Sequence, residues 1–394
     1  MSEDKVVFLG GARTAVGTYG GTLSQVPTHQ LGAHAMKAAL ENVDVSAETV
    51  DEVVIGCVGQ VGEEAFLARR IALGAGARDD STAMTVNRLC GSGLQAVQSA
   101  ALELRTGDAR YAVAGGAENM SLQPFLDYGA RDGWRLGDRT VIDGTKSLIT
   151  DPFGQYPMGN TAEAVATEFG ISREEQDIFA AESQRRATKA QEDGLFDAEI
   201  APIEISRKRE NITFAKDEHI RPGTSAEKLS KLRPAFVKDG TVTAGNSSGI
   251  NDAAAALVLS LESTAQADGL QPIGELVAFA KAGIRPEIMG YAPKLATERV
   301  LEKSGLTLEQ IDWIELNEAF AAQAVAVVRD LGMDPEKVNP LGGAIALGHP
   351  VGATGSILTL RTLINLKRTG GEYGLVTMCI GGGQAVAAII RVAQ

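Results

Sequence analysis

The chain has 394 residues, of which 44% are hydrophobic and 22% are charged, and its formal net charge is −13. This balance is typical of a globular protein with large apolar cores and two or three domains. A surface this negative repels nucleic acid and anionic lipid, so neither is an expected partner, whereas an anionic small molecule can still bind a local basic patch.

The first residues carry no hydrophobic region of the kind found in signal peptides, and no apolar run reaches the roughly 20 residues that span a bilayer. Three cysteines are too few for a dense disulfide framework. We therefore expect a soluble, cytoplasmic protein whose cysteines are buried or catalytic.

The first part of the chain alternates short apolar strands with helices, which predicts mostly parallel sheets covered by helices. A helical stretch at 31–40 leads into the strand Asp51–Gly56, and the segment Val86–Cys90 leads into a second helix and a strand that begins at Tyr111. In the second helix apolar residues recur at helical spacing, and Gly107 is a suitable left-handed cap at its end.

Cys90 lies in the turn between a short apolar strand, Ala83–Asn87, and this helix, and the sequence Gly91-Ser92-Gly93 follows it. Glycines allow a tight turn and a close approach of substrate, and a helix N-terminus favours a thiolate over a thiol. These are the features of an activated nucleophile. The alternative is a buried, inert cysteine, which is a common fate of this residue.

Residues 121–249 form a more charged and less regular region. It contains one long amphipathic helix, predicted for Arg173–Glu192, with Ser172 and Glu175 as a capping box. A basic patch follows, made of Arg207, Lys208, Arg209, Lys216 and Arg221. A long insertion with its own helices is usually a lid or a binding loop, and the alternative is a structural excursion or an oligomer contact.

The last part of the chain repeats the pattern of the first. A helix and the strand Asp312–Asn317 are followed by Val338–Gly342, a further helix and a strand that begins at Tyr373. The intervals between corresponding segments are 312 − 51 = 261 and 339 − 87 = 252 residues. Two similar βαβ halves are the simplest explanation of this repetition.

Two side chains of the second half lie at the ends of strands. Asn317 can hold a water molecule or donate toward an oxyanion, although asparagine is also a frequent helix N-cap. Cys379 follows an apolar strand at the position that Gly115 has in the first half, and ligands bind at such strand ends. Cys57 has no comparable surroundings, and we assign it to the core.

Histidine occurs four times in the sequence. His349 lies in the glycine-rich segment Leu347–Gly355, which suggests a base delivered to a crowded point, although a loop histidine without a role is about as common. We expect His29, His34 and His219 to be structural or at the surface.

Taken together, these residues make the sequence resemble the thiolase family over essentially its whole length. Each matching stretch is weak alone, but the set is specific in its order and spacing. The stretches are Arg13-Thr-Ala-Val-Gly17, Asn87-Arg-Leu-Cys-Gly-Ser-Gly93, Gly115-Gly-Ala-Glu-Asn-Met-Ser121, Leu232-Arg-Pro-Ala-Phe236, Thr241-Val-Thr-Ala-Gly-Asn-Ser-Ser-Gly249, Asn317-Glu-Ala-Phe-Ala321, Gly342-Gly-Ala-Ile-Ala-Leu-Gly-His-Pro350 and Cys379-Ile-Gly-Gly-Gly383.

The resemblance implies an α/β, thiolase-like fold in which two similar α/β halves are packed as αβαβα layers, with an inserted loop domain. The N-terminal half would comprise residues 1–120, completed by 250–270. The loop domain, which would bind coenzyme A, would comprise 121–249, and the C-terminal half 271–394.

The resemblance also implies an acyltransferase that acts on coenzyme A thioesters without a metal or a cofactor. Cys90 would take the acyl group, His349 would activate Cys90, and Cys379 would move the α-proton of acetyl-CoA. Asn317 would hold a water that forms one oxyanion hole together with His349. The backbone N–H groups of Cys90 and Gly381 would form the other.

Coenzyme A would lie against the loop domain, where Arg221 is suited to its negatively charged nucleotide end. The positions that match the family's binding residues are Met158, Arg221, Phe236, Ala244, Ser248, Met289 and Phe320. Members of the family are usually dimers or tetramers, so a homodimer or homotetramer is expected.

One position departs from part of the family. Thiolases dedicated to acetoacetyl-CoA usually carry His-Met-Gly where this chain has Pro157-Met158-Gly159. Proline cannot donate a side-chain hydrogen bond. We therefore expect a 3-ketoacyl-CoA thiolase of broad chain length, as in fatty-acid breakdown by β-oxidation, with a short-chain acetoacetyl-CoA thiolase of biosynthetic type as the alternative.

Three rival functions remain at this point. A decarboxylating ketoacyl synthase would typically have two histidines, or a histidine and an asparagine, where this chain has His349 and Cys379. A non-catalytic acyl-CoA or lipid carrier on the same fold should have lost a catalytic residue. A nucleotide-binding module would need a complete phosphate motif, which the glycine-rich loops lack.

Overall fold

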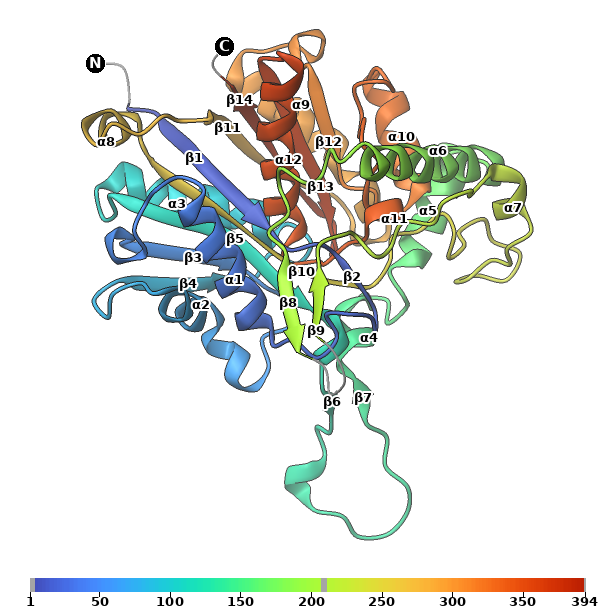
Figure 1. Cartoon of the computed structure of the whole chain (residues 1–394). Helices are drawn as coiled ribbons and strands as arrows, with labels where there is room; N and C mark the ends of the chain where they lie inside the picture. The colour runs from blue at the N-terminus through green and yellow to red at the C-terminus, as the bar shows by residue number, and fades with distance from the viewer. Residues whose placement is uncertain (1–3, 207–210, 393–394) are drawn as a thin grey trace.

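The structure is a computed structural model that describes residues 4–206 and 211–392 (Figure 1). Arg207, Lys208 and Arg209 of the predicted basic patch lie outside the described residues. Within the described residues, no helix is long and apolar enough to cross a bilayer.

A ten-stranded sheet runs through the molecule in the spatial order β12-β13-β14-β11-β1-β10-β5-β3-β4, with the short strand β2 paired to β10. The strands are β1 Val6–Arg13, β2 Gly17–Thr18, β3 Glu52–Gly56, β4 Thr82–Val86, β5 Tyr111–Asn119, β10 Asn251–Leu261, β11 Gly274–Gly283, β12 Trp313–Leu316, β13 Tyr373–Ile380 and β14 Gln384–Arg391. The two halves of the sheet join where β1 pairs with β11, through Val7 with Glu275 and Phe8 with Gly274.

The sheet is mixed, so the expectation of mostly parallel sheets is wrong. Only β3 with β4, β3 with β5, and β12 with β13 pair in parallel among the described strands. The other pairs are antiparallel because β10 and β14 run back alongside β5 and β13. In the second half this return is a short hairpin between β13 and β14, which needs no crossover helix.

The internal repeat is visible in matching hydrogen bonds. Asp51 before β3 and Asp312 before β12 each accept two backbone N–H groups at the start of the neighbouring strand, β5 or β13. The distances are 2.8 and 3.2 Å for Asp51, and 2.7 and 3.1 Å for Asp312. The two halves therefore begin their central strands in the same way.

The strand register corrects one predicted correspondence. Ile55 of β3 pairs with Gly115, and its counterpart Leu316 of β12 pairs with Thr377. Gly115 therefore corresponds to Thr377, and Cys379 lies two residues further along its strand. The proposed match between Cys379 and Gly115 was wrong because sequence spacing alone cannot fix a strand register.

Five layers are stacked through the molecule, in the order αβαβα (Figure 1). Helices α1 (Thr28–Glu41) and α2 (Leu67–Ala75) cover the outer face of the first half-sheet, and α9 (Ala292–Ser304) and α10 (Ala321–Leu331) cover that of the second. Helices α3 (Ser92–Thr106) and α12 (Thr354–Thr369) lie between the half-sheets. The helix predicted after Cys90 is α3, and Gly107 is its left-handed cap.

The two central helices touch through glycines near their N-terminal ends. A Cβ on Gly93 of α3 would lie 2.7 Å from the Ser356 nitrogen, and a Cβ on Gly355 of α12 would lie 2.2 Å from the Leu94 nitrogen. Real Cβ atoms do not approach backbone so closely, so only glycine permits this crossing. The N-termini that follow Cys90 and His349 are thereby held side by side.

The region between the halves supplies helices and short strands of its own. They are β6 Phe125–Leu126, β7 Ile142–Asp143, α4 Gly144–Leu148, α5 Gly159–Phe169, α6 Arg173–Glu192, β8 Ile203–Ser206, β9 Asn211–Phe214 and α7 Ala226–Ser230. Helix α6 has the predicted bounds and the predicted capping box of Ser172 and Glu175. The remaining short helices are α8 Glu262–Ala267 and α11 Ala344–Leu347.

A buried ion cluster fastens this region to the sheet. Arg13 at the end of β1 is fully buried and pairs with Asp217 at 2.7 Å and with Glu199 at 2.8 Å. Arg361 of α12 shares Glu199 at 3.2 Å. The cluster thus joins β1, the inserted region and the central helix layer.

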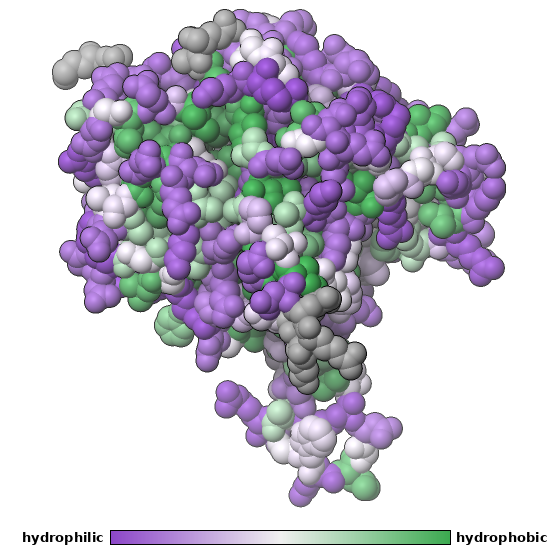
Figure 2. All heavy atoms as spheres, in the orientation of Figure 1, coloured by the Kyte–Doolittle hydropathy of each residue, from purple (hydrophilic) through white to green (hydrophobic). Residues whose placement is uncertain are grey.

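The chain from β6 to β7 projects from the body as an arm, seen at the bottom of Figure 1. Several of its large hydrophobic side chains are exposed, among them Phe125, Tyr128, Trp134 and Leu136. Figure 2 shows this arm standing clear of the body with hydrophobic atoms in contact with solvent.

Candidate active site

A cavity of about 510 Å³ lies where the inserted region meets the two halves. Ten of the twelve predicted site residues line it: Cys90, Met158, Arg221, Phe236, Ala244, Ser248, Met289, Phe320, His349 and Gly381. The other two, Asn317 and Cys379, are not part of the lining and are 1% and 0% exposed. Segments from all parts of the sequence therefore converge on one place.

Cys90 lies in a tight turn between β4 and α3. Leu89 has a positive φ of 47°, which is an uncommon conformation for a branched side chain. The Ser92 hydroxyl holds this turn, because its oxygen accepts from the Arg88 N–H at 2.9 Å and its hydrogen goes to the Leu89 carbonyl at 2.6 Å. The turn presents Cys90 to the cavity one residue before the N-cap of α3.

The electrostatics of Cys90 differ from the sequence-based expectation. Burial raises the pKa of the thiol to about 11, although the N–H groups of Gly381 and of Cys90 itself lower it in part. The helix N-terminus therefore does not leave Cys90 as a thiolate, because the cost of burying a charge is larger. The thiol needs a base beside it to react as a nucleophile.

His349 is suited to be that base because it is neutral. Burial lowers the pKa of its imidazole to about 4. Its backbone N–H donates to Asn251 Oδ1 at 2.9 Å, which fixes the loop to the start of β10. His349 is 6% exposed, so solvent has little access to it.

A threonine determines which imidazole nitrogen is free. His349 Nδ1 lies 2.7 Å from Thr354 Oγ1, and that hydroxyl donates its single hydrogen to the Pro350 carbonyl at 3.0 Å. The threonine oxygen then accepts from Nδ1–H, so we assign the proton to Nδ1. Nε2 is left as the basic nitrogen, on the side of Asn317, whose Nδ2 lies 3.5 Å away.

Asn317 is not a helix N-cap, since α10 begins at Ala321 and its N-cap is Phe320. Its Oδ1 atom is buried and has no hydrogen-bond partner among the described residues. A buried amide oxygen without a protein partner is suited to hold a water molecule. This feature fits the role that the resemblance implied for Asn317.

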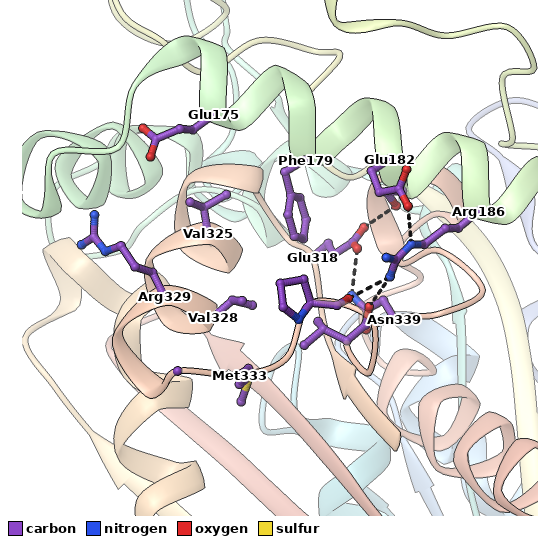
Figure 3. Close-up of a pocket in the computed structure, with 14 residues that line it drawn as sticks. Glu175, Phe179, Glu182, Arg186, Glu318, Val325, Val328, Arg329, Met333 and Asn339 are labelled. Atoms are coloured by element: carbon purple, nitrogen blue, oxygen red, sulfur yellow. Dashed lines mark hydrogen bonds and ion pairs between the residues drawn. The ribbon is translucent and has the colours of Figure 1, made fainter. Parts of the chain in front are cut away.

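The next residue, Glu318, fixes the position of Asn317. The Glu318 carboxylate accepts from Ser183 Oγ at 2.6 Å, from Asn339 Nδ2 at 2.8 Å and from the Ile345 N–H at 3.2 Å. Figure 3 shows Glu318 and Asn339 facing each other below α6. The inserted region, through Ser183 of α6, thus helps to hold the strand end that carries Asn317.

Cys379 is the next-to-last residue of β13 rather than the residue after it. Its thiol is fully buried and lies 3.2 Å from the side-chain amide of Gln323. Burial, together with a charge on nearby Cys90, raises the pKa of Cys379 above its usual value. The two cysteines are therefore close enough to influence each other.

The chain turns sharply after β13, and Gly381 lies in this turn. Its N–H and that of Cys90 both act on the Cys90 sulfur and lower the pKa of its thiol. Two backbone donors that converge on one point are what an oxyanion hole requires. An added Cβ at Gly381 would lie 2.9 Å from Met158 Cε, so the flexible end of Met158 would have to move aside.

One wall of the cavity is apolar. Phe236 and Phe320 pack edge to face with ring centroids 6.1 Å apart, and Met158 packs beside them. Met289 is 3% exposed and also lines the cavity. Ser248 joins the 244–250 loop to this wall by donating its N–H to the Ala319 carbonyl at 3.0 Å.

The mouth of the cavity is more polar. Arg221 is exposed there, and its backbone N–H donates to Gln184 Oε1 at 2.8 Å. His219, which we expected to be structural or at the surface, also lines the cavity. Burial and the charge of Arg221 lower the pKa of His219 to about 4, so it is neutral. In the sequence, its position two residues before Arg221, a predicted binding residue, indicated that it could lie at this cavity.

A second cavity, of about 450 Å³, lies between α6 and α10 (Figure 3). Its lining includes Phe179, Val325, Val328 and Met333, and its polar edge includes Arg186. It contains none of the predicted site residues. In the described parts of the chain, no cluster of three or more histidine, cysteine or carboxylate side chains could hold a metal ion.

The family comparisons cover nearly the whole chain. Residues 6–263 match the family model described as thiolase, N-terminal domain, and residues 270–392 match thiolase, C-terminal domain. The boundary between the two falls after β10.

Individual relatives agree with these matches. The chain is 48% identical to the beta-ketothiolase BktB of Cupriavidus necator, over 98% of this chain and 99% of the relative. It is 48% identical to an acetyl-CoA acetyltransferase of Pseudomonas aeruginosa, over 97% and 98%. Among solved structures, the Bacillus anthracis acetyl-CoA acetyltransferase superposes with a TM-score of 0.97 at 43% identity, covering 99% of both chains. Human mitochondrial 3-ketoacyl-CoA thiolase in complex with CoA superposes with a TM-score of 0.95 at 41% identity, covering 99% of this chain and 98% of that one.

Proposed function

Because the chain belongs to the thiolase family and is an acyltransferase, we propose that it transfers acyl groups reversibly through an acyl-Cys90 intermediate. In one direction 3-ketoacyl-CoA and CoA give acyl-CoA and acetyl-CoA. The observation that supports this most directly is the convergence of Cys90, His349 and Gly381 on one cavity, with Cys379 buried beside them.

Thiolysis begins when His349 Nε2 takes the Cys90 proton and the thiolate attacks the ketone carbon of 3-ketoacyl-CoA. The bond between C2 and C3 then breaks, and the electron pair leaves as the enolate of acetyl-CoA. Cys379 gives its proton to the enolate carbon. Cys379 then regains a proton from His349. His349 next takes the thiol proton of CoA, the CoA thiolate attacks the acyl group, and the departing Cys90 thiolate regains a proton from His349.

Two sites stabilise negative oxygen atoms in this scheme. A water held by Asn317, together with His349 Nε2, faces the enolate oxygen. The N–H groups of Cys90 and Gly381 face the oxygen of the tetrahedral intermediate at Cys90. Fixed donors of this kind contribute about 3 kcal/mol each to the transition state in other acyl-transfer enzymes.

We place CoA along the cavity toward the inserted region, with no metal and no cofactor in the reaction. Met158, Met289 and Phe320 supply an apolar channel for pantetheine and acyl chain, and Arg221 at the mouth suits the anionic nucleotide end. The human mitochondrial relative with CoA bound supports CoA as the substrate.

For the acyl chain we propose broad length specificity, of the kind used in fatty-acid breakdown. Pro157 lines the cavity and offers no side-chain donor. The names of the relatives include both acetyl-CoA acetyltransferases and a 3-ketoacyl-CoA thiolase, so a short-chain enzyme of biosynthetic type is the second candidate. A non-catalytic carrier is less favoured, because all four catalytic side chains are present.

The test is the CoA-dependent loss of absorbance of the 3-ketoacyl-CoA enolate, with four-carbon and eight-carbon substrates. We expect the native protein to cleave both and Cys90→Ala to cleave neither. Pro157→His should shift the ratio of rates toward the four-carbon substrate. Cleavage of the four-carbon substrate alone would refute broad specificity, and cleavage of neither would favour the carrier.

We also propose a homodimer or homotetramer in the cytoplasm. Strand β4 is one of the two edge strands of the sheet and offers one surface for assembly. The arm, with its exposed hydrophobic side chains, offers a second. All three cysteines are unpaired, as is usual in a reducing compartment. Light scattering on the native protein and on a variant with the arm shortened at 127–141 tests the assembly: a native monomer would refute it.

A further inference from the structure

Gln323 of α10 is a buried polar residue that the proposed mechanism does not use. It is 0% exposed and lies beneath the cavity, with its side chain directed at Cys379. A Cβ at Gly290 would lie 2.6 Å from Gln323 Cβ, so the side chain is packed tightly against the segment before α9. The backbone of Gly290 thus packs directly against the base of the Gln323 side chain.

The orientation of this amide follows from its other two partners. With the oxygen toward the Ala324 N–H, at 2.7 Å, the nitrogen faces the Asn317 carbonyl at 3.2 Å. The opposite orientation would place oxygen against oxygen and nitrogen against nitrogen. We therefore assign Nε2 to the side of Asn317, and this is also the atom 3.2 Å from Cys379 Sγ.

The geometry points to Gln323 as a positioning residue for Cys379. The Gln323 amide donates one N–H to the Cys379 sulfur and the other to the Asn317 carbonyl. This inference rests on the proposed function. The N–H stabilises the thiolate that removes the α-proton of acetyl-CoA: the C–H bond breaks, an S–H bond forms, and the electron pair enters the enolate. The same amide ties Cys379 to Asn317, which serves the enolate oxygen.

The charge environment makes such a donor useful. The group whose charge acts on Cys379 is Cys90, and it disfavours a second thiolate. Burial also raises the pKa of Cys379. Once Cys90 is acetylated its charge is gone, and the Gln323 N–H is the side-chain donor that the described residues place on the Cys379 sulfur.

The experiment separates the two half-reactions in the full-length protein. Acetylation of Cys90 by acetyl-CoA is followed by intact mass, and α-proton exchange of acetyl-CoA in D₂O is followed across pH. The variants are Gln323→Met, which has no donor, and Gln323→Glu, which is isosteric and has no donor when it is ionised. Gln176→Glu is the control, since Gln176 is also fully buried and its amide nitrogen donates to the Ile171 carbonyl at 3.5 Å and to Thr241 Oγ1 at 2.9 Å.

We expect both Gln323 variants to acetylate Cys90 at a rate close to that of the native protein. Their exchange near neutral pH should be about 10-fold slower, with the exchange profile shifted to higher pH by about one unit. The control should do neither. Unchanged exchange profiles in both variants, or acetylation slowed as much as exchange, would overturn the inference. Absence of acetylation and exchange in the native protein would instead show that the proposed function has failed.

Discussion

Replacement of Thr354 by valine tests how the histidine base is prepared. Valine has nearly the same shape as threonine but cannot accept the hydrogen of His349 Nδ1, which lies 2.7 Å from Thr354 Oγ1 in the native protein. The buried N–H would then be unpaired, at a cost of about 1–3 kcal/mol. If the ring responds by moving its proton to Nε2, it can no longer accept the Cys90 proton.

At about 1.4 kcal/mol for each factor of ten, this cost predicts acetylation of Cys90 that is about 10- to 100-fold slower. Binding of CoA should hardly change, because Thr354 is buried and does not line the cavity. The assay is the pre-steady-state release of CoA when enzyme and acetyl-CoA are mixed rapidly, which reports acetylation alone.

Thr359→Val is a matched control on the same helix. Thr359 is also buried, and its hydroxyl donates to the Gly355 carbonyl at 2.8 Å without contact to His349. The reasoning is refuted if Thr354→Val acetylates at the native rate. It is also refuted if Thr359→Val is slowed equally, because the effect would then come from distortion of α12.

Three further predictions concern binding and stability. Arg221→Ala should raise the KM for CoA about 5-fold and leave kcat unchanged, because an exposed ion pair contributes up to about 1 kcal/mol. Steady-state kinetics with varied CoA would measure this rise in KM, and a change in kcat alone would contradict the prediction. Burial raises the folded-state pKa of Glu315 to about 7, so the native protein holds this proton more tightly than the unfolded chain does, and stability from this group falls as pH rises from about 4.5 to 7. Glu315→Gln should therefore lessen this fall in the free energy of unfolding in urea by up to about 3 kcal/mol. If the free energy of the variant changed with pH as steeply as that of the native protein, the raised pKa of Glu315 would be refuted. Arg13→Met should lower the free energy of unfolding by about 3–5 kcal/mol, because it leaves the buried carboxylates of Asp217 and Glu199 with one fewer cation beside them. An unfolding midpoint in urea equal to that of the native protein would contradict this prediction.

The sequence contained the residues of the candidate site but not their electrostatics. Glycine-rich motifs identified Cys90, His349 and Cys379, because close approach of backbone to substrate requires glycine and leaves a readable pattern. The same local pattern predicted a stabilised thiolate at Cys90. The pKa of Cys90 is instead raised, since it depends on burial by segments hundreds of residues away.

Residues that act through others were harder to recognise. Gln323 lies in an alanine-rich helix and has no motif of its own, and Thr354 is one of several threonines along α12. Their roles depend on distances to Cys379 and His349 that only the folded chain creates. The strand directions likewise depend on how β10 and β14 return to the sheet, which alternation of strands and helices does not reveal.

The glycine crossing of α3 and α12 has a consequence for how this enzyme tolerates change. Cys90 and His349 come from halves of the chain that are far apart in sequence, yet the helices that follow them meet backbone to backbone at Gly93 and Gly355. No side chain at this contact can be exchanged for a larger or smaller one, so repacking of the surrounding core does not alter the spacing there. Substitutions can accumulate in the outer helices and the cavity wall, and so change which acyl chains fit, while the nucleophile and its base keep their separation.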